Sequence, residues 1–396
     1  MLADQIGAQS KKIVWVSPLI VDIHLHKTSR LEILRALSER GHQVRLIASY
    51  SSRNNPNERL GVPTLLFPLR YFPSFSPSAY TILLSLVLPI LFIRSRPDYA
   101  IIEPDVTVFG MATTFLLPKS IRPKVILDIR STPVNISGLG GFLKSFFFGI
   151  AVHVSKQFFQ GITIITEMMK KEVCQVFHID PHNVGVWTSG VSTVLFNPQK
   201  YDETSIKKEC GLEDRFVVFY HGMLGEKRGI PQTIKAIEIL KKKCPDLVLF
   251  LLGSDPDLDL KRLAQELEVE KMVIVHGRVS YAEIPKYISM CEAGLMPLPN
   301  HPDWRNQCPL NLLEYLAMKK PVIATDIPAN REILGNSKCG IYASSANSEE
   351  IARAIAYAYE NRAEIGDWGA FGRIIVEERY TWNKVAEKFE TYLLKL

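Results

Sequence analysis

The sequence shows few features of a metal-binding, secreted or nucleic-acid-binding protein. Its six cysteines are scattered, with neither a CxxC pair nor metal-ligand spacing, so we expect reduced thiols in a cytosolic compartment and no bound metal. The formal charge of +6 is not gathered into a Lys/Arg run, which argues against nucleic acid as a partner. This small excess of positive charge would suit a phosphate-bearing substrate or an anionic membrane surface. An ordinary solvated surface with no such partner explains the charge more simply.

A secretory leader and a long apolar run are also missing. The opening residues, MLADQIGAQSKK, lack an apolar core and run into a strand-like segment, so export is not expected. The most apolar stretch, residues 79–93, has 15 residues and contains Pro89, whereas a membrane-spanning helix needs about 20. We therefore expect a buried or interfacial helix at this place, in a cytoplasmic protein.

The length and composition predict a folded protein of two domains. The chain has 396 residues, which is too many for one ordinary hydrophobic core and natural for two domains of somewhat under 200 residues each. Hydrophobic residues make up 47% and charged residues 22% of the chain, the balance of a soluble globular protein.

Strand-like runs alternate with helical patterns in two successive series, which predicts two α/β domains with doubly wound parallel sheets. The first series lies at 13–18, 43–48, 99–103, 124–129 and 161–166, and the second at 216–220, 247–252, 272–275, 293–297, 321–324 and 340–343. The predicted domains are 1–197 and 198–380, joined within the polar stretch 196–210. The last segment, 381–396, is an amphipathic helix that would pack back on the first domain.

The segment 306–334, NQCPLNLLEYLAMKKPVIATDIPANREIL, carries the strongest chemical signal. Its PLNLLEYLA portion places a helix N-terminus at four residues, whose free N–H groups suit a diphosphate. These residues are Pro309, Leu310, Asn311 and Leu312. Glu314 follows in the same helix, where a carboxylate would accept hydrogen bonds from ribose hydroxyls. For PVIATD alone, an ordinary amphipathic helix over a buried strand is the better explanation.

The whole string resembles the donor-binding region of glycosyltransferase family 4, a family of group 1 glycosyltransferases. There an E-x7-E pattern precedes an EYLA-like turn and a PVIATD-like strand. Glu314 matches the second glutamate, and Asn306 stands where the family has the first. The resemblance covers most of the C-terminal half and, more loosely, the N-terminal half. It implies the GT-B architecture, in which two Rossmann-like domains face each other across a cleft, the first binding the acceptor and the second the nucleotide-sugar donor.

A second part of the resemblance lies in the segment 219–237, FYHGMLGEKRGIPQTIKAI. A strand ends here at the turn of Gly222, and Arg228 precedes a further glycine, where the family has a basic residue that contacts the donor diphosphate. Many relatives have another basic residue after the first glycine, whereas this chain has Met223. The phosphate clamp would then rest on Arg228, helix N–H groups and Lys227. For this segment alone, a solvent-exposed turn arginine is the simpler explanation.

Three weaker patterns agree with the same family. Gly253 ends the strand-like run LFLLGSD, and Gly277 with Arg278 ends VIVHGRVS, where the family lines the nucleotide base. Gly190 lies in VGVWTSGVSTVLFNP, which resembles the family's hinge loop near the donor.

The first half departs more from the family. Where relatives have a Gly-Gly loop, this chain has PLIVDIHLHKTSR, in which His24, His26 and Lys27 would contact the acceptor. A bland loop explains the histidine pair better than a metal, since no third ligand has recognisable spacing. Arg130 follows the strand-like run VILDI. It would bind a substrate oxygen or, equally well, pair with Asp128.

The segment 138–159, GLGGFLKSFFFGIAVHVSKQFF, combines phenylalanines with two lysines. Such a helix can seat in a membrane interface, which would give a peripheral contact at the inner membrane face. Burial in the core explains the phenylalanines about as well.

The function predicted from these patterns is sugar transfer from a nucleoside diphosphate donor to a glycan or lipid-linked acceptor. The family implies retention of anomeric configuration, no metal cofactor and no protein nucleophile. Arg228, Asn306 and Arg130 are the catalytic candidates. Because Met223, Asn306 and Arg130 depart from the family pattern, a non-catalytic sugar-nucleotide-binding subunit is an alternative, and a sugar-nucleotide epimerase of the same fold is another.

Overall fold

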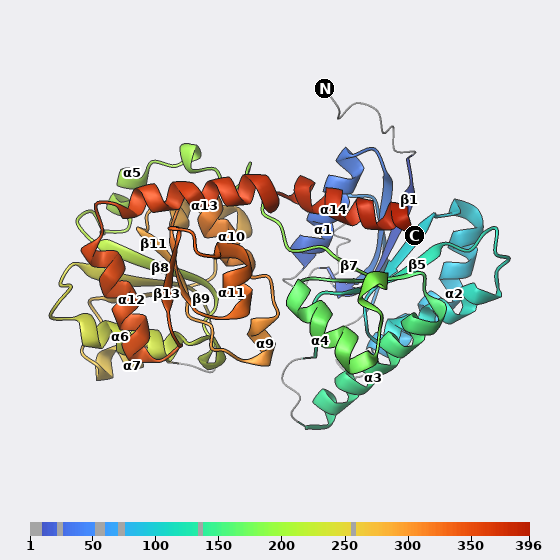
Figure 1. Cartoon of the computed structure of the whole chain (residues 1–396), viewed down its shortest axis with the longest axis horizontal. Coiled ribbons are helices and arrows are strands. Elements are labelled where there is room, and N and C mark those ends of the chain that lie inside the picture. Colours follow the sequence, from blue (N-terminus) through green and yellow to red (C-terminus); the bar gives the residue numbers. More distant parts are fainter. Residues whose placement is uncertain (1–9, 22–26, 52–59, 70–75, 134–137, 255–258) are drawn as a thin grey trace. The chain divides into compact units, whose positions relative to one another are not determined.

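The computed structural model describes residues 10–21, 27–51, 60–69, 76–133, 138–254 and 259–396 (Figure 1). The chain forms two compact units. The first consists of Met1–Thr188 with Trp382–Leu396, and the second of Ser189–Thr381. The amphipathic C-terminal segment thus groups with the first unit.

The chain passes from one unit to the other at residue 188, nine residues before the predicted boundary at 197. Hydrogen bonds explain the shift, because the segment after Thr188 is tied to the second unit. The Ser189 hydroxyl donates to the Cys308 carbonyl at 3.1 Å, and the Val191 N–H donates to the Tyr380 carbonyl at 2.8 Å. The predicted linker region itself contains a helix, so it is not an extended connection.

The first unit is a parallel sheet covered by helices on both faces. Its strands are β1 (Lys12–Ile20), β2 (Gln43–Tyr50), β3 (Thr64–Pro68), β4 (Tyr99–Ile102), β5 (Lys124–Ile129), β6 (Gly161–Ile164) and β7 (Val184–Val186). Its helices are α1 (Lys27–Glu39), α2 (Ser76–Ser95), η2 (Val106–Leu116), α3 (Gly138–Phe158), α4 (Glu167–Phe177), η3 (Pro181–Asn183) and α14 (Trp382–Lys395). The strand order is β3-β2-β1-β4-β5-β6-β7, and every pairing is parallel. The prediction missed β3 and β7.

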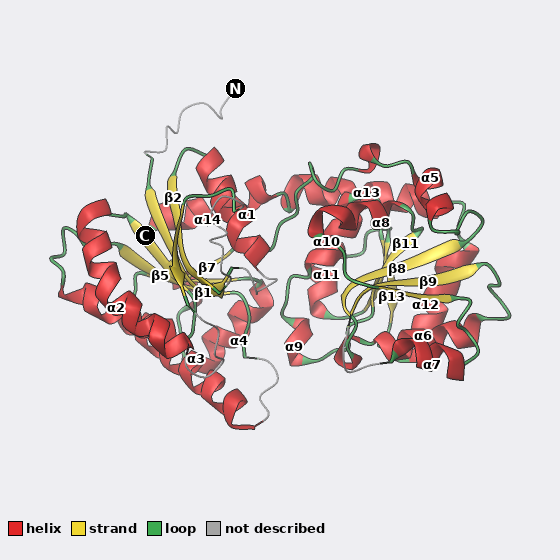
Figure 2. Ribbon diagram, turned by 180° about the vertical axis from the view of Figure 1, so that it is seen from behind, coloured by secondary structure: helices red, strands yellow, loops and turns green. Residues whose placement is uncertain are grey.

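Helices α1 and α14 pack together on one side of this sheet, and α2, η2 and α3 form a layer on the other (Figure 2). In α2 the buried side chains recur at helical spacing: Tyr80, Leu84, Leu88 and Phe92. Among the described helices, α2 alone is long and apolar enough to cross a membrane, by length and composition. One face of α2 is, however, buried within the fold of the first unit.

The C-terminal helix α14 completes the core of the first unit. Phe389 is fully buried, stacks on Trp187 with ring centroids 5.0 Å apart, and lies 6.1 Å from the ring of Trp15. The neighbouring Glu390 forms ion pairs with His42 at 2.9 Å and Arg40 at 2.5 Å. These contacts join the last helix to elements that lie about 200 residues or more earlier in the chain.

The second unit has the same doubly wound organisation. Its strands are β8 (Phe216–Met223), β9 (Leu247–Ser254), β10 (Val273–His276), β11 (Ala293–Met296), β12 (Val322–Thr325) and β13 (Gly340–Ala343). Its longer helices are α5 (Glu203–Glu209), α6 (Ile230–Leu240), α7 (Leu260–Glu266), α10 (Leu310–Ala317), α11 (Pro328–Leu334), α12 (Ser348–Glu360) and α13 (Ile365–Arg379). Short helices are η4 (Pro198–Lys200), η5 (Glu226–Arg228), η6 (Tyr281–Glu283), α8 (Ile284–Ser289) and α9 (Pro302–Arg305). The strand order is β10-β9-β8-β11-β12-β13.

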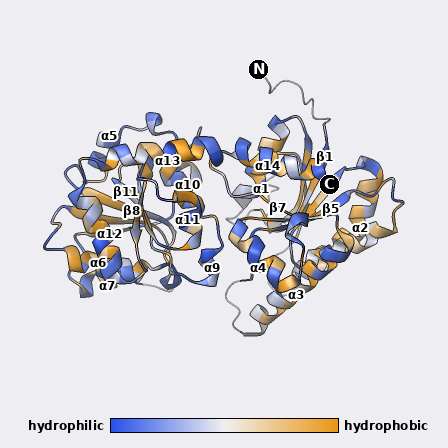
Figure 3. Ribbon diagram, viewed as in Figure 1, coloured by the Kyte–Doolittle hydropathy of each residue, from blue (hydrophilic) through white to orange (hydrophobic). Residues whose placement is uncertain are grey.

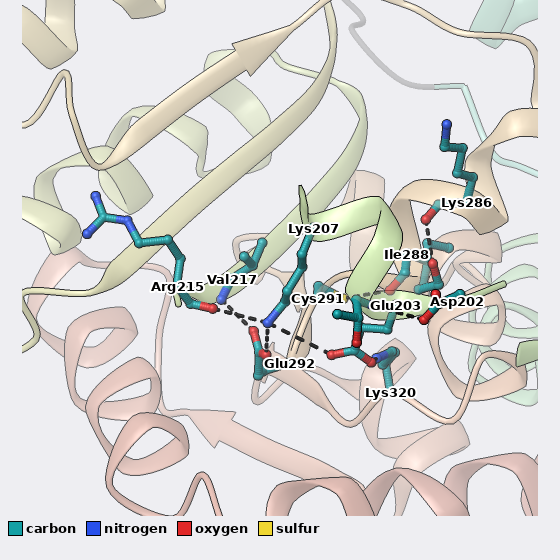
Figure 4. Close-up of polar contacts among 12 residues, drawn as sticks. Asp202, Glu203, Lys207, Arg215, Val217, Lys286, Ile288, Cys291, Glu292 and Lys320 are labelled. Carbon is teal, nitrogen blue, oxygen red and sulfur yellow. Dashed lines mark hydrogen bonds and ion pairs between the residues drawn. The ribbon is translucent and has the colours of Figure 1, made fainter. Parts of the chain in front are cut away.

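A buried ion pair fixes the start of the second unit's sheet. The Lys207 ammonium of α5 pairs with Glu292, which precedes β11, and donates to the Arg215 carbonyl at 3.1 Å (Figure 4). The other Glu292 oxygen accepts the Val217 N–H of β8 at 2.6 Å. Burial raises the pKa of Glu292, while the Lys207 charge opposes that shift. The pair therefore ties α5 to two adjacent strands.

Loss of the Lys207 charge should destabilise the second unit. We predict that Lys207→Ala lowers its free energy of unfolding by about 2 kcal/mol, because removal of one partner leaves the partly buried Glu292 carboxylate without a compensating charge. Lys208 is the next residue and is exposed, so Lys208→Ala should change the same quantity by less than about 0.5 kcal/mol. Urea unfolding curves of the two variants test the assignment, and equal losses would contradict it.

Candidate functional site

The carboxyl edge of the second sheet holds three glycines with positive φ, and at two of them, Gly253 and Gly229, no side chain fits. The chain winds from β8 towards β10 on one side and from β11 towards β13 on the other, so the switch point lies between β8 and β11. A Cβ on Gly253 would lie 1.8 Å from the Gly222 carbonyl oxygen, and one on Gly229 would lie 2.2 Å from the Pro297 carbonyl oxygen. All three glycines have positive φ, of 128°, 152° and 74° for Gly222, Gly253 and Gly229.

Arg228 lies in the turn between β8 and α6, immediately before Gly229. Its guanidinium stacks over the indole of Trp304 at 4.5 Å, and the Trp304 ring N–H donates to the Lys227 carbonyl at 2.9 Å. Burial raises the pKa of the Tyr220 hydroxyl, and the nearby Arg228 opposes that shift. Two contacts from α9 thus hold a permanent positive charge at this edge of the sheet.

Glu314 is the fifth residue of α10, and only 2% of its side chain is exposed. One carboxylate oxygen accepts the Tyr281 hydroxyl at 2.8 Å, and the other lies 3.0 Å from the His221 Nε2 atom. The carboxylate was expected in the first turns of the helix and open to a ligand. Its place in the first turns is as expected, but its side chain is buried, and both its oxygens have protein neighbours.

The amino end of α10 was predicted to present free N–H groups. The helix begins at Leu310, its N-cap is Pro309, and no side chain caps it. The Asn311 side-chain amide donates a hydrogen bond to the His221 carbonyl at the end of β8, at 3.0 Å. Leu312 is buried in the core. The uncapped backbone groups of this end lie beside the end of β8.

Asn306, the other half of the expected pair, is the C-cap of α9 and is 1% exposed. It lies two residues after Trp304, so one short segment carries both Asn306 and the residue that supports Arg228.

The remaining donor-site candidates lie at three places in the second unit. Arg278 is exposed on the loop after the edge strand β10. Lys227 is exposed, and its backbone carbonyl accepts the Trp304 bond. Gly190 is buried next to Val191, which pairs with Thr381 in an isolated bridge.

In the first unit, Arg130 is buried in protein contacts. Its guanidinium donates to the Trp187 carbonyl at 2.7 Å and stacks over the Trp187 ring at 3.6 Å. Asp128 accepts the Trp187 ring N–H at 2.8 Å and the Thr163 hydroxyl at 2.7 Å. Burial raises the pKa of Asp128, and the Arg130 charge opposes that shift. The sequence offered two interpretations for Arg130, binding of a substrate oxygen and a structural contact within the protein. The contacts described here agree with the structural interpretation.

The switch point of the first sheet, between β1 and β4, carries a buried pair that the sequence analysis missed. Arg30 donates to Glu103 at 2.7 Å, and the Ser17 hydroxyl donates to the same carboxylate at 2.6 Å. His24 and His26 lie outside the described residues, and Lys27 begins α1.

Three residues near Arg228 and Glu314 were also missed: His221, Tyr281 and Trp304. The position of His221 directly before Gly222, at the end of a strand, was a usable signal. Within the described part of the chain, no group of three or more His, Cys, Asp or Glu side chains is placed to hold a metal ion.

The arrangement in the second unit combines a fixed cation, uncapped N–H groups and a buried carboxylate. The first two favour an anion such as a phosphate, and the third favours hydroxyl donors. All lie at the carboxyl ends of β8 and β11 or on the segments that follow these strands, which is where doubly wound sheets bind nucleotides.

The chain matches known proteins in its second half. Residues 202–374 match the family described as Glycosyl transferases group 1. The chain is 25% identical over 207 residues to the GDP-mannose-dependent alpha-(1-6)-phosphatidylinositol monomannoside mannosyltransferase of Mycobacterium tuberculosis. This alignment covers 52% of the chain and 54% of the relative, so the chain spans about half the length of the curated relatives it matches.

Two solved structures resemble the chain over nearly its whole length. A glycosyltransferase from Rickettsia africae superposes with a TM-score of 0.77 at 15% identity, covering 98% of this chain and 99% of that one. HepE of Anabaena, solved in complex with UDP, superposes with a TM-score of 0.76 at 15% identity, covering 97% and 100%. Residues 202–374 therefore match group 1 glycosyl transferases in sequence, and the whole chain has the GT-B fold of two Rossmann-like parallel-sheet domains.

Proposed function

We propose that the chain is a family 4 glycosyltransferase that moves a hexose-like sugar from a nucleoside diphosphate donor to a glycan or lipid-linked acceptor, with retention of configuration. Two observations at the carboxyl edge of the second sheet carry this proposal: the cation of Arg228 is stacked on Trp304, and the amino end of α10 has no side-chain cap. Negative charge develops on the diphosphate as the sugar leaves, and preorganised positive charge at that place lowers the barrier. This role requires neither a metal ion nor a protein nucleophile.

The relatives support a nucleotide sugar as the donor. One is named as GDP-mannose-dependent, and the Anabaena protein was solved in complexes with UDP and with UDP-glucose. We propose that Glu314 accepts hydrogen bonds from the ribose, with Gly222, Gly253 and Arg278 around the nucleotide. We propose that the first unit binds the acceptor, because its loops vary most between such enzymes.

A contact with an anionic membrane is the second part of the proposal, and it would place this cytoplasmic enzyme at the inner membrane face. Helices α2 and α3 both pack on η2 and contain many hydrophobic residues (Figure 3). Each also keeps exposed apolar side chains. We call this the apolar surface, and it comprises Ile82, Leu86, Ile90 and Ile93 of α2 with Phe142, Leu143 and Phe146 of α3.

Charge supports a lipid bilayer as the occupant of the apolar surface. Neither α2 nor α3 contains an acidic residue, and Arg94, Lys144 and Lys156 are exposed on them. Exposed aromatic and aliphatic side chains flanked by basic residues are typical of helices in the headgroup region of anionic membranes. A lipid-linked acceptor would be reached at the same surface.

The first prediction concerns the donor diphosphate. Arg228→Ala should weaken binding of the nucleotide-sugar donor by about 10- to 150-fold, because a charge-assisted hydrogen bond contributes about 1.5–3 kcal/mol. Arg215 lies directly before β8, at the opposite edge of the same sheet. Arg215→Ala therefore removes the same charge away from the proposed site and serves as the control. Titration calorimetry with the donor that best raises the melting temperature gives the measurement. A similar small effect of both substitutions would reject the diphosphate assignment.

The second prediction separates an enzyme from an inert binding subunit. Asn306→Ala should lower kcat at least tenfold while donor affinity changes less, because its contact with the sugar should strengthen towards the transition state. Asn300→Ala, an exposed substitution in the preceding loop, is the control. Product analysis by mass spectrometry is the assay. Absence of transfer by the unmodified chain would support the binding subunit, and full activity of Asn306→Ala would remove its catalytic role.

The third prediction tests the membrane contact by vesicle flotation. The chain should float with phosphatidylglycerol vesicles at low salt and much less with phosphatidylcholine vesicles or at high salt. Leu86→Ser with Phe146→Ser should reduce the recovered fraction at least tenfold, because burial of each side chain contributes about 1.5–3 kcal/mol. Phe371→Ser with Ile374→Ser removes two exposed apolar side chains from α13 and should leave recovery unchanged. Equal, negligible flotation with both lipids at low salt would rule out the attachment.

A further inference from the structure

The buried carboxylate of Glu314 is held from two directions by side chains outside α10. His221 approaches one oxygen from the end of β8, with its Nε2 atom 3.0 Å away at ion-pair distance. Tyr281 approaches the other oxygen from η6, with its hydroxyl at 2.8 Å. The three residues come from three separate elements, β8, η6 and α10, so the fold of the second unit brings them together.

The two neighbours of Glu314 differ in how firmly they are held. The ring of His221 packs edge-on against Tyr315, with centroids 5.3 Å apart, and its backbone N–H donates to the Tyr315 hydroxyl at 3.2 Å. Its backbone carbonyl accepts the Asn311 amide at 3.0 Å. Tyr281 is instead 39% exposed, in a three-residue helical turn. His221 is therefore the fixed neighbour and Tyr281 the exposed one.

Burial makes the His221 contact energetically important. A carboxylate with 2% of its side chain exposed has lost most of its hydration, so neighbouring protein groups must take the place of that water. The Nε2 atom of the fixed His221 imidazole lies 3.0 Å from one Glu314 oxygen without forming a hydrogen bond in this orientation, and the ring limits the rotation of the carboxylate. A hydrogen-bond acceptor that is already oriented loses little entropy when a ligand hydroxyl arrives.

We propose that His221 is a positioning residue for nucleotide recognition: it holds the Glu314 carboxylate in the orientation that accepts the ribose hydroxyls. The inference rests on the proposed function, because it takes Glu314 as the ribose ligand. His221 touches neither phosphate nor sugar in this role and acts through Glu314. The substrate class that it selects is a ribonucleotide rather than a deoxyribonucleotide.

The readout that isolates this role is the ratio of affinities for a ribonucleotide and its dideoxy form. Titration calorimetry would compare UDP and GDP with 2′,3′-dideoxy-UDP and 2′,3′-dideoxy-GDP on the full chain. The unmodified chain should prefer the better ribonucleotide at least tenfold, since charge-assisted hydrogen bonds are strong. Glu314→Gln should reduce that ratio to within about threefold of unity.

Two substitutions of His221 then separate positioning from packing. His221→Phe keeps an aromatic ring against Tyr315 but has no polar edge, and it should lower the ratio nearly as far as Glu314→Gln. His221→Gln carries an amide N–H of similar reach and should keep at least half of the unmodified ratio. Affinity for the dideoxynucleotides should change less than threefold in both variants.

The outcomes distinguish the failure of this inference from the failure of the proposed function. If Glu314→Gln leaves the ratio unchanged, Glu314 is not the ribose ligand and both proposals fail at that residue. If Glu314→Gln removes the preference but His221→Phe retains it, the positioning role alone is overturned. If His221→Phe weakens ribonucleotide and dideoxynucleotide binding equally, His221 serves only the packing of the sheet edge, which also overturns the inference.

Discussion

The site in the second unit depends on two places where backbone meets backbone with no room for a Cβ atom. Gly253 lies against the Gly222 carbonyl, and Gly229 lies against the Pro297 carbonyl. The first contact brings the ends of β8 and β9 together, and the second sets the turn of Arg228 against the strand end before α9. Any side chain at Gly253 or Gly229 would push these loops apart, and the cation of Arg228 would leave the indole of Trp304.

Several carboxylates in the two units are largely shielded from water, and the fold places a basic side chain beside each of them. Glu314, Glu292 and Glu103 are all carboxylates that the fold removes from water, and each has a basic side chain beside it: His221, Lys207 and Arg30. Two of these pairs lie near the carboxyl ends of strands, where the doubly wound fold gathers its ligands, and the third ties the opposite edge. Pairing of buried charge therefore serves both stability and the organisation of the site.

The sequence predicted the fold well, because periodicity reports which residues face a core. Of the thirteen strands in the described parts of the chain, eleven were expected, and the two that were missed, β3 and β7, have five and three residues. Side-chain partners were harder to foresee. The contacts of His221 with Glu314 and of Arg228 with Trp304 join residues 93 and 76 positions apart, and no local pattern encodes them. The boundary at residue 188 likewise follows from hydrogen bonds to Cys308 and Tyr380, which the polar composition of 196–210 does not reveal.

The place of α14 has a consequence for the order in which a nascent chain can fold. The second unit is continuous in sequence, whereas the first begins near the amino end and is completed by α14 after residue 381. Translation delivers all of the second unit before Phe389 exists to cover Trp15 and Trp187. The unit that starts first is thus finished last, and its aromatic core face stays open on the ribosome throughout synthesis of the second unit. Such a face is a natural binding surface for the chaperones that accompany translation.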